Sequence, residues 1–339
     1  MDIIRTHFTP ALRKVPGIVV GVLEKDELDI VSLGTVETAP DPGSLCWEIG
    51  SITKVFTGLL LADMSLRGEI GLDDPIGRHL PDPVARRLPA LQPTLTDLAT
   101  HTSGLPRLPM SICRMAKKSD NPYSRLTEDD VFDYLGAKTK RPRRRKSRYS
   151  NYGMGLLGHL LARTGGQPYA ALLEERILAP LGMSATQIGS CGEGTATVQG
   201  FRKGQPTPPW TFGALEGAGG LRSTVDDLTA FARACIDPPG GTVGEALQLA
   251  NQPFHRTRTP AGNKGLGWML RTRDRKKRTT ETTWHNGGTY GAASFLAVDP
   301  PRSTAIVAFG NTGPGLFAPL DGPSWAVFDS LGPERSAGE

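Results

Sequence analysis

The chain has 339 residues, of which 38% are hydrophobic and 22% are charged, and its formal net charge is +5. These fractions are typical of a globular protein with a sizeable core, and they exclude a disordered or fibrous chain. No stretch approaches the roughly 20 apolar residues of a membrane span, and the first residues lack the pattern of an export signal. We therefore expect a cytoplasmic protein that does not bind membranes; a sequence from which an export signal was trimmed is the alternative.

The predicted elements begin with strands near the N-terminus and continue with a helix. Strands are expected at 17–23, 28–33 and 45–49, where apolar and β-branched residues gather. The run from Val55 to Met64 is apolar at helical spacing, and Gly68 supplies a stop.

The rest of the chain divides into a helical middle and a strand-rich end. From about residue 76 to 205, helices are expected at 94–99, 127–135, 152–163 and 169–178. A helix at 226–235 precedes strands at 265–270, 280–284, 292–298 and 304–309, and a last helix starts near Ser324. Strands at both chain ends predict an α/β (α+β) fold with one antiparallel sheet built from both ends and flanked by helices.

Ser51 and Lys54 stand one turn apart, where the first helix is expected to begin. Residues i and i+3 share a helix face, so the serine hydroxyl and the lysine amine can meet. A serine becomes a useful nucleophile when a neighbouring base takes its proton, and a buried lysine with a lowered pKa can be that base. A helix-capping serine beside a solvated lysine is the alternative interpretation of this pair alone.

Two further motifs favour the catalytic interpretation. They are Tyr149-Ser150-Asn151 and His285-Asn286-Gly287, the latter followed by Gly288. Together with the Ser-x-x-Lys pair they resemble the three motifs of the serine beta-lactamase and penicillin-binding-protein superfamily. The class C beta-lactamase-like branch, which includes D-alanyl carboxypeptidases, D-aminopeptidases, esterases and transacylases, carries Tyr-x-Asn and often His-x-Gly. Segments 101–106, 218–228 and 265–268 also resemble this family, in the same order.

The resemblance implies a division of the chain into two domains. A sheet domain would comprise residues 1–75 plus 206–339, and a mostly helical domain of residues 76–205 would be inserted into it. The active site would lie in the groove between them.

The resemblance also implies acyl transfer through a covalent ester of Ser51. Lys54 and Tyr149 would share the role of base, and the backbone N–H groups of Ser51 and Gly288 would form the oxyanion hole. Whether Lys54 or Tyr149 is the base stays open. A tyrosine with a pKa near 10 is a poor base, so a neighbouring cation, for which Lys54 is the candidate, must lower its pKa.

The remaining site residues are expected to bind substrate. Asn151 would bond a substrate amide or orient Lys54, and His285 and Gly287 would line the substrate site. True beta-lactamases carry a lysine where this chain has His285, and histidine is mostly neutral at pH 7. Leu108 likewise stands where class C beta-lactamases have a polar residue. Both departures favour esters, amides or thioesters over penicillins.

One segment carries most of the positive charge. Eight basic residues lie between Lys138 and Arg148, and without them the net charge would be 5 − 8 = −3. Because the run ends at Tyr149, it favours an anionic substrate or an acidic carrier protein as partner. A solvated loop is the alternative, and nucleic-acid binding is not expected because aromatics and a nucleic-acid-binding motif are missing.

Cysteine and histidine spacing predicts neither a metal site nor a cofactor. Cys46, Cys113, Cys191 and Cys235 form no C-x-x-C pair and are expected to be unpaired, buried side chains in a reducing compartment. The histidines lack metal-ligand spacing, and His101 is expected to be a structural turn residue.

Three functions fit these patterns. The leading hypothesis is a serine hydrolase that acts on a small ester or amide through an acyl-serine. The second is an acyltransferase with the same intermediate, in which an amine or alcohol replaces water. The third is a binding module that is acylated without turnover.

Overall fold

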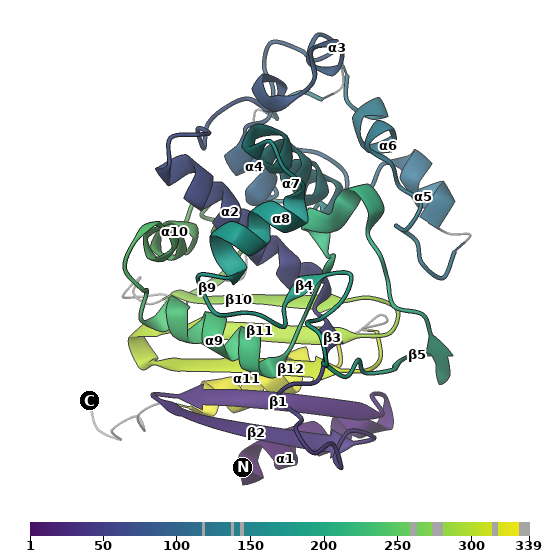
Figure 1. The fold of residues 1–339 in the computed structure, drawn as a ribbon, viewed down its shortest axis with the longest axis vertical. Helices are drawn as coiled ribbons and strands as arrows, with labels where there is room; N and C mark the ends of the chain where they lie inside the picture. The colour runs from purple at the N-terminus through teal and green to yellow at the C-terminus, as the bar shows by residue number, and fades with distance from the viewer. Residues whose placement is uncertain are drawn as a thin grey trace.

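The computed structural model describes residues 1–116, 119–136, 139–142, 146–257, 263–272, 281–313 and 318–331. In this part of the chain, the main feature is a seven-stranded antiparallel sheet in the order β2-β1-β12-β11-β10-β9-β8 (Figure 1). Its strands are β1 (Gly17–Glu24), β2 (Glu27–Gly34), β8 (Asn263–Lys264), β9 (Met269–Thr272), β10 (Glu281–Gly288), β11 (Ala293–Asp299) and β12 (Thr304–Gly310). The predicted single sheet built from both chain ends is confirmed.

The sheet separates two hydrophobic cores. Successive side chains of a strand point to opposite faces. In β1, Val19 and Leu23 belong to the core shared with the central helices, whereas Ile18 and Val20 face the N- and C-terminal helices. Because both faces of β1 are covered, its sequence is a continuous apolar run rather than an alternating one.

Helices cover both faces of the sheet (Figure 1). On one face lie α1 (Asp2–Phe8) and α11 (Asp321–Ser330), which contact each other, and α9 (Val225–Ile236) lies on the other. Beyond α9 are α2 (Thr53–Leu66), α4 (Leu95–Ala99), α7 (Asn151–Gly165), α8 (Tyr169–Leu173) and α10 (Thr242–Ala250). Shorter helices are α3 (Asp82–Ala85), α5 (Met110–Ala116) and α6 (Glu128–Asp133).

Helix α2 is the axis of the helical layer. Every residue from Thr53 to Met64 is buried, because α2 packs against α7 on one side and α10 on another. A helix that is covered all round needs apolar residues on every face, which explains the unbroken apolar run. Ser51 lies just before α2, in the 3-10 turn Gly50–Ile52, so the helix begins two residues after the predicted nucleophile.

Two small sheets connect this layer to the large one. Strands β3 (Trp47–Glu48), β7 (Leu221–Ser223) and β4 (Gln187–Ile188) form one, and β5 (Gly200–Arg202) and β6 (Gln205–Thr207) form the other. The domain limits at 75/76 and 205/206 stay a prediction.

The cysteine prediction is wrong for two of the four residues. Cys46 and Cys191 form a disulfide across a sequence separation of 145, while Cys113 and Cys235 are free. Backbone bonds accompany the disulfide: the N–H of Cys46 donates to Ala196 O, and its C=O accepts from Val198 N. These contacts bring the segments side by side, which no spacing rule in the sequence could indicate.

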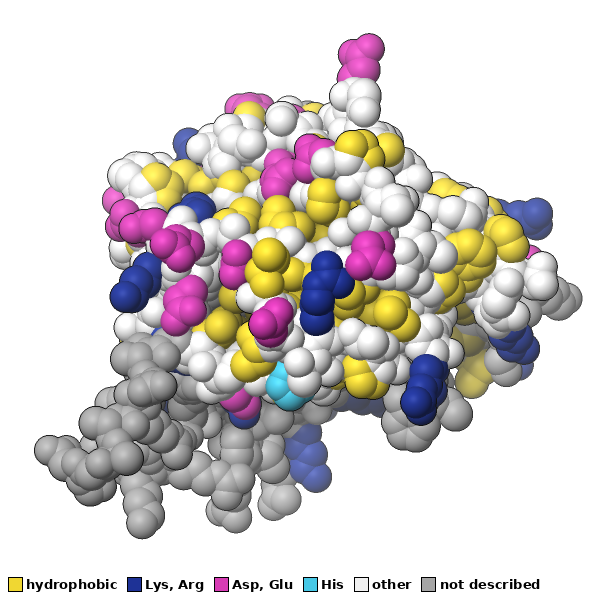
Figure 2. All heavy atoms as spheres, turned by 90° about the horizontal axis from the view of Figure 1, so that it is seen from below, with side chains coloured by type: hydrophobic (Ala, Val, Ile, Leu, Met, Phe, Trp, Pro, Cys, Tyr) yellow, Lys and Arg dark blue, Asp and Glu magenta, His cyan; other side chains and the backbone are white. Residues whose placement is uncertain are grey.

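The surface seen from below Figure 1, on the side of β2 and α1, mixes side chains of several kinds. Figure 2 shows hydrophobic, acidic and basic side chains interspersed there. No helix among the described residues has both the length and the apolar character needed to cross a bilayer.

Candidate active site

The structure brings Ser51 and Lys54 together at the N-terminus of α2. The Nζ atom of Lys54 lies 2.9 Å from Ser51 Oγ and donates to the carbonyl oxygen of Ala218 at 2.5 Å. Lys54 is completely buried, whereas Ser51 keeps some exposure. The predicted contact between hydroxyl and amine is therefore present, with the serine open to a ligand.

Burial decides the protonation state of Lys54. Removal from water lowers its pKa well below the usual 10.5, and the nearby Arg107 cation lowers it further. A neutral amine has a lone pair, which can accept the hydroxyl proton of Ser51 while an N–H still donates to Ala218. The arrangement is that of a general base poised on a nucleophile.

Tyr149 stands on the other side of the serine. It shares a hydrogen bond with Ser51, and its ring centroid lies 5.0 Å from Lys54 Nζ and 5.3 Å from the Arg107 guanidinium. Burial nevertheless raises the Tyr149 pKa above its usual value of 10. The expectation that a neighbouring cation brings this pKa below its usual value is wrong, because desolvation outweighs the lowering by Arg107. Tyr149 is suited to donate a proton rather than to take one.

The end of β10, where the oxyanion donor Gly288 is predicted, lies against the Ser51 turn. Strand β9 pairs with β10 only from Glu281 to Trp284, so the last residues of β10 face the Gly50–Ile52 turn. The N–H of Thr289 points to β11, where it donates to Ala292, so by strand alternation that of Gly288 points to the opposite edge. A Cβ added to Gly50 would lie 2.7 Å from the Gly288 nitrogen.

The glycine at position 287 allows this close approach. A Cβ there would lie 2.0 Å from Ile49 O and 3.0 Å from the Ser51 nitrogen. The backbones of residues 287–288 and of the Ser51 turn are therefore in close contact, which is compatible with a shared oxyanion hole. A side chain at position 287 would prevent this approach. The oxyanion role of Ser51 and Gly288 and the substrate contact of Gly287 stay predictions.

Asn151 begins α7 and points into the same region. Its Nδ2 donates to the hydroxyl of Tyr123 at 3.1 Å, and its buried Oδ1 has no partner among the described residues. Asn151 therefore bonds Tyr123 rather than Lys54, and its free oxygen is available to a substrate N–H. Ser150 caps the helix by accepting from Gly153 N at 2.8 Å, which fixes the direction of Asn151.

His285 is fully buried beneath Tyr149. Its Nδ1 donates to the carbonyl oxygen of Asn286 at 2.6 Å, and its ring centroid is 6.1 Å from that of Tyr149. Burial and the proximity of Lys54 lower its pKa to about 3. His285 is consequently a neutral packing partner of Tyr149, not a cation exposed to substrate.

A second neutral ring supports Tyr149 from another side. The ring centroid of His101 lies 4.5 Å from that of Tyr149, and its Nδ1 accepts from Ser150 N at 3.2 Å. Its φ of +60° confirms the predicted turn. Burial lowers its pKa well below 6.5.

Several neighbours of the site were not predicted. Arg107 is exposed and close to Tyr149, and Tyr123 stacks on Phe212 with a centroid separation of 4.9 Å. The signal for Arg107 was its place directly after the 101–106 segment; Tyr123 had none. Leu108, which stands where class C beta-lactamases have a polar residue, is partly buried and packs against the main core.

The described part of the basic run contains an ion pair. Arg141 is paired with buried Asp97, with 2.6 Å between Nε and Oδ2. Lys138 and residues 143–145 lie outside the described part of the chain. In that described part, no group of three His, Cys, Asp or Glu side chains is arranged to hold a metal ion.

Comparisons with known proteins give matches over most of the chain. The Beta-lactamase family model matches residues 4–326. A beta-lactamase of Escherichia coli (strain K12) is 26% identical over 97% of this chain and 93% of that protein. The D-alanyl-D-alanine-carboxypeptidase/endopeptidase AmpH of the same organism is 32% identical over 76% and 68%.

The fold has a close counterpart among solved structures. A class C beta-lactamase from Rhodobacter sphaeroides superposes with a TM-score of 0.82, covering 97% of this chain and 99% of that one at 22% identity. The chain therefore belongs to the beta-lactamase family of serine hydrolases.

Proposed function

We propose that this protein hydrolyses a small ester or amide through a covalent ester of Ser51. The observation that carries the proposal is the 2.9 Å contact between Ser51 Oγ and a lysine amine that burial keeps neutral. In the first step the serine oxygen bonds to the substrate carbonyl carbon while its proton passes to Lys54 Nζ. The negative oxygen that forms is bound by the N–H groups of Ser51 and Gly288.

The second half of the reaction reverses these roles. The tetrahedral adduct collapses, the bond to the leaving group breaks, and the leaving group takes the proton that Lys54 received, directly or relayed through the Tyr149 hydroxyl, so that Lys54 is neutral again. Water then attacks the acyl carbonyl and gives a proton to Lys54. When the bond to Ser51 Oγ breaks, that oxygen takes the proton back from Lys54, the acid is released and the enzyme is restored.

We infer that the substrate carries a negative charge. Burial lowers the pKa of Lys54 well below its usual value and that of His285 to about 3, so neither is suited to bind a carboxylate as a fixed cation. Arg107 is exposed beside Tyr149, and none of the ion pairs of the described residues involves it. It is therefore the group that would bind an anion at this site. An acidic carrier protein finds less support, because Arg141 is already paired with Asp97.

The test is the mass of the intact protein after reaction with a panel of acyl donors. The panel contains a chromogenic cephalosporin, short aryl esters with and without a carboxylate, a D-Ala-D-Ala peptide and a fluorophosphonate. Ser51→Ala is the control. We expect a mass increment in the wild type that is absent from Ser51→Ala and decays in water.

The outcomes separate the alternatives. Decay that is accelerated by an added amine, with amide as product, would indicate an acyltransferase. An increment that never decays would indicate a binding module. A folded wild-type protein that gains no mass with any reagent would overturn the proposal.

A further inference from the structure

Glu48 joins the nucleophile segment to the end of the oxyanion strand. It lies in β3, three residues before Ser51, and is half-buried. Its Oε2 accepts from the Thr289 hydroxyl at 3.0 Å, and its Oε1 accepts from the Trp210 N–H at 2.7 Å. Thr289 directly follows Gly288, so one carboxylate holds the residue next to the predicted oxyanion donor.

The hydrogen bonds around Thr289 require an acceptor at this place. Its hydroxyl oxygen accepts from Gly291 N at 3.2 Å and from Ala292 N at 3.1 Å, which occupies both lone pairs. The hydroxyl hydrogen must therefore be donated, and Glu48 Oε2 receives it. The backbone N–H of Trp210 is a second donor to Glu48. A carboxylate can accept from both donors at once, one with each oxygen.

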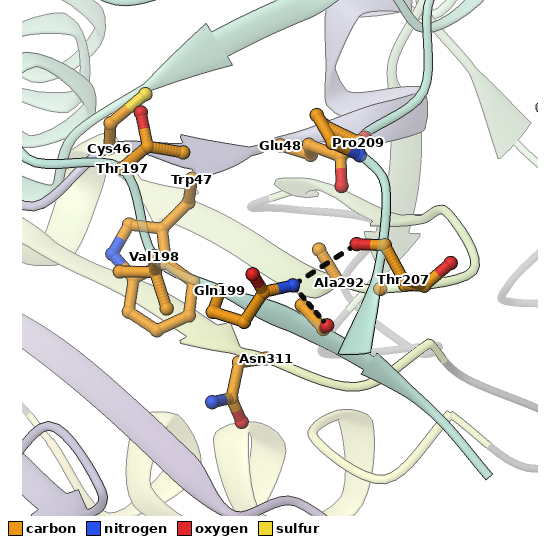
Figure 3. Close-up of a pocket in the computed structure, with 12 residues that line it drawn as sticks. Cys46, Trp47, Glu48, Thr197, Val198, Gln199, Thr207, Pro209, Ala292 and Asn311 are labelled. Carbon is orange, nitrogen blue, oxygen red and sulfur yellow. Dashed lines mark hydrogen bonds between the residues drawn. The ribbon is translucent and has the colours of Figure 1, made fainter. Parts of the chain in front are cut away.

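A cavity borders one side of the turn that follows Gly288. Figure 3 shows Glu48, Thr207 and Ala292 around this cavity of about 230 Å³, which Gly291 also lines. Away from the cavity, the Tyr290 ring packs on Trp210 with a centroid separation of 4.6 Å, and Gly313 N donates to Tyr290 O at 3.1 Å. On the cavity side, the hydrogen bonds of Thr289 link the turn to Glu48.

Burial and hydrogen bonding act on the Glu48 carboxyl group in opposite directions. Removal from water raises the pKa of Glu48, while Trp210, Thr289 and the Arg222 cation lower it. Arg222 lies directly opposite Glu48 in the pairing of β3 with β7. A neutral side chain would avoid the cost of desolvation, so the carboxylate must contribute something that packing does not.

We propose that Glu48 is a positioning residue that aims the Gly288 N–H at the developing oxyanion by holding Thr289. The inference rests on the proposed function above. It follows from geometry: an oxyanion donor stabilises the transition state only when it is aimed at the oxygen, and losing one costs on the order of 10²–10³ in rate. A donor that is present but misaligned should lower the rate less than a donor that is removed.

The test is a double-mutant cycle on acylation. Glu48→Gln places an NH₂ group against one of the two donors, and Thr289→Val removes the hydroxyl. We expect each variant to slow acylation by an aryl ester and by a fluorophosphonate roughly 10- to 100-fold. The double variant should be no slower than the slower single one, because both changes break the same link.

Two measurements distinguish positioning from a structural role. Non-covalent ester binding, measured as Kd in the Ser51→Ala background, should be unchanged in both variants. Asp74→Asn is the matched control, since Asp74 is a half-buried carboxylate beyond the far end of α2 that also accepts a backbone N–H, from Gly71 at 2.8 Å. It should acylate at the wild-type rate.

The inference and the proposed function fail in different ways. Acylation of Glu48→Gln and Thr289→Val within twofold of the wild type, or strictly additive losses, would overturn the role of Glu48 alone. A wild-type protein that is never acylated would count against the proposed function itself. If Glu48→Gln does not fold, Thr289→Val still tests the link through its own acylation rate and Kd.

Discussion

The chemistry of this site depends on keeping Lys54 away from water. A fully buried ammonium whose described partners are a hydroxyl and a carbonyl oxygen has no counter-charge, so its proton is released easily. Tyr149 and two histidines surround the same region without adding charge, because burial keeps each of them neutral near pH 7. The site is thus prepared for a proton transfer from Ser51 rather than for binding a fixed cation.

The pH dependence of kcat/KM should report Lys54. The base works only when neutral, so activity should rise with pH through the Lys54 pKa, well below 10.5, and then stay level. The His285 pKa of about 3 places its titration outside the range of such an assay, so no step near pH 6.5 is expected from it. A pH–rate profile with an aryl ester checks this, and Lys54→Arg should be inactive throughout because arginine stays protonated.

Arg107 should control the preference for charged substrates. Arg107→Gln is expected to raise KM about tenfold for a carboxylate-bearing ester, since one charge-assisted hydrogen bond is lost, and to leave kcat within about threefold. The matched methyl ester, which lacks the charge, should be turned over as by the wild type. Equal losses for both esters would show that Arg107 acts through Tyr149 instead.

Helix α2 packs closely against the loop 265–267. Gly58 and the loop 265–267 touch through their backbones: a Cβ at Gly58 would lie 2.1 Å from Leu266 O. Gly267 has a φ of +76°, and a Cβ added there would lie 2.1 Å from Lys54 O. Glycines at these two positions therefore set how deeply Lys54 is buried.

Gly58→Ala should destabilise the protein although alanine favours helix. The gain in helix propensity is about 1 kcal/mol, whereas displacing a backbone in a packed core costs about 1–3 kcal/mol and would move Lys54. Urea unfolding should show a net loss together with reduced acylation. Gly322→Ala in α11 is the control, because a Cβ there meets nothing within 4 Å, and it should be neutral or slightly stabilising. A stabilised Gly58→Ala would contradict the packing described above.

Elements with a strong local pattern could be predicted from the sequence. The strands near Gly17 and Thr304 are continuous apolar runs, and Thr127 caps α6 in a capping box with Asp130, as its pattern suggests. Strand β10 continues to Gly288, beyond its predicted end, because its glycines approach the nucleophile turn instead of ending the strand. Local patterns indicate which elements form but not which segment each one meets.

The electrostatics of the site were less predictable for the same reason. Ser51, Lys54, Tyr149 and Gly288 stand in recognisable motifs, so their meeting was expected. The raised pKa of Tyr149, by contrast, depends on the balance between desolvation and charges brought in by other segments. The partnership of Glu48 with Thr289 joins residues 241 apart, and a sequence alone gives no measure of such contacts.

The Cys46–Cys191 disulfide ties distant parts of the fold together. It joins two residues that are 145 apart in the sequence, and one of them, Cys46, lies five residues before Ser51. Replacing both cysteines with serine should lower the free energy of unfolding by about 2–4 kcal/mol, because the unfolded chain regains the freedom that the loop removes. Chemical denaturation with and without reductant measures this.

Thiol counting provides the control for that experiment. Alkylation of the denatured protein should modify two cysteines, Cys113 and Cys235, without reductant and four with it. Four modified cysteines in the absence of reductant would show that the bond does not form in solution.

The position of β1 has a consequence for synthesis on the ribosome. Strand β1 leaves the exit tunnel early with β2, yet its other neighbour is β12, and Gly17 N donates to Asn311 Oδ1 at 2.7 Å. A lone two-stranded hairpin is marginally stable in water. Until residues 304–310 emerge, the apolar edge of β1 stays unpaired and prone to aggregation. Nascent chains that stall before β12 should therefore depend on chaperones, however well their helices have already packed.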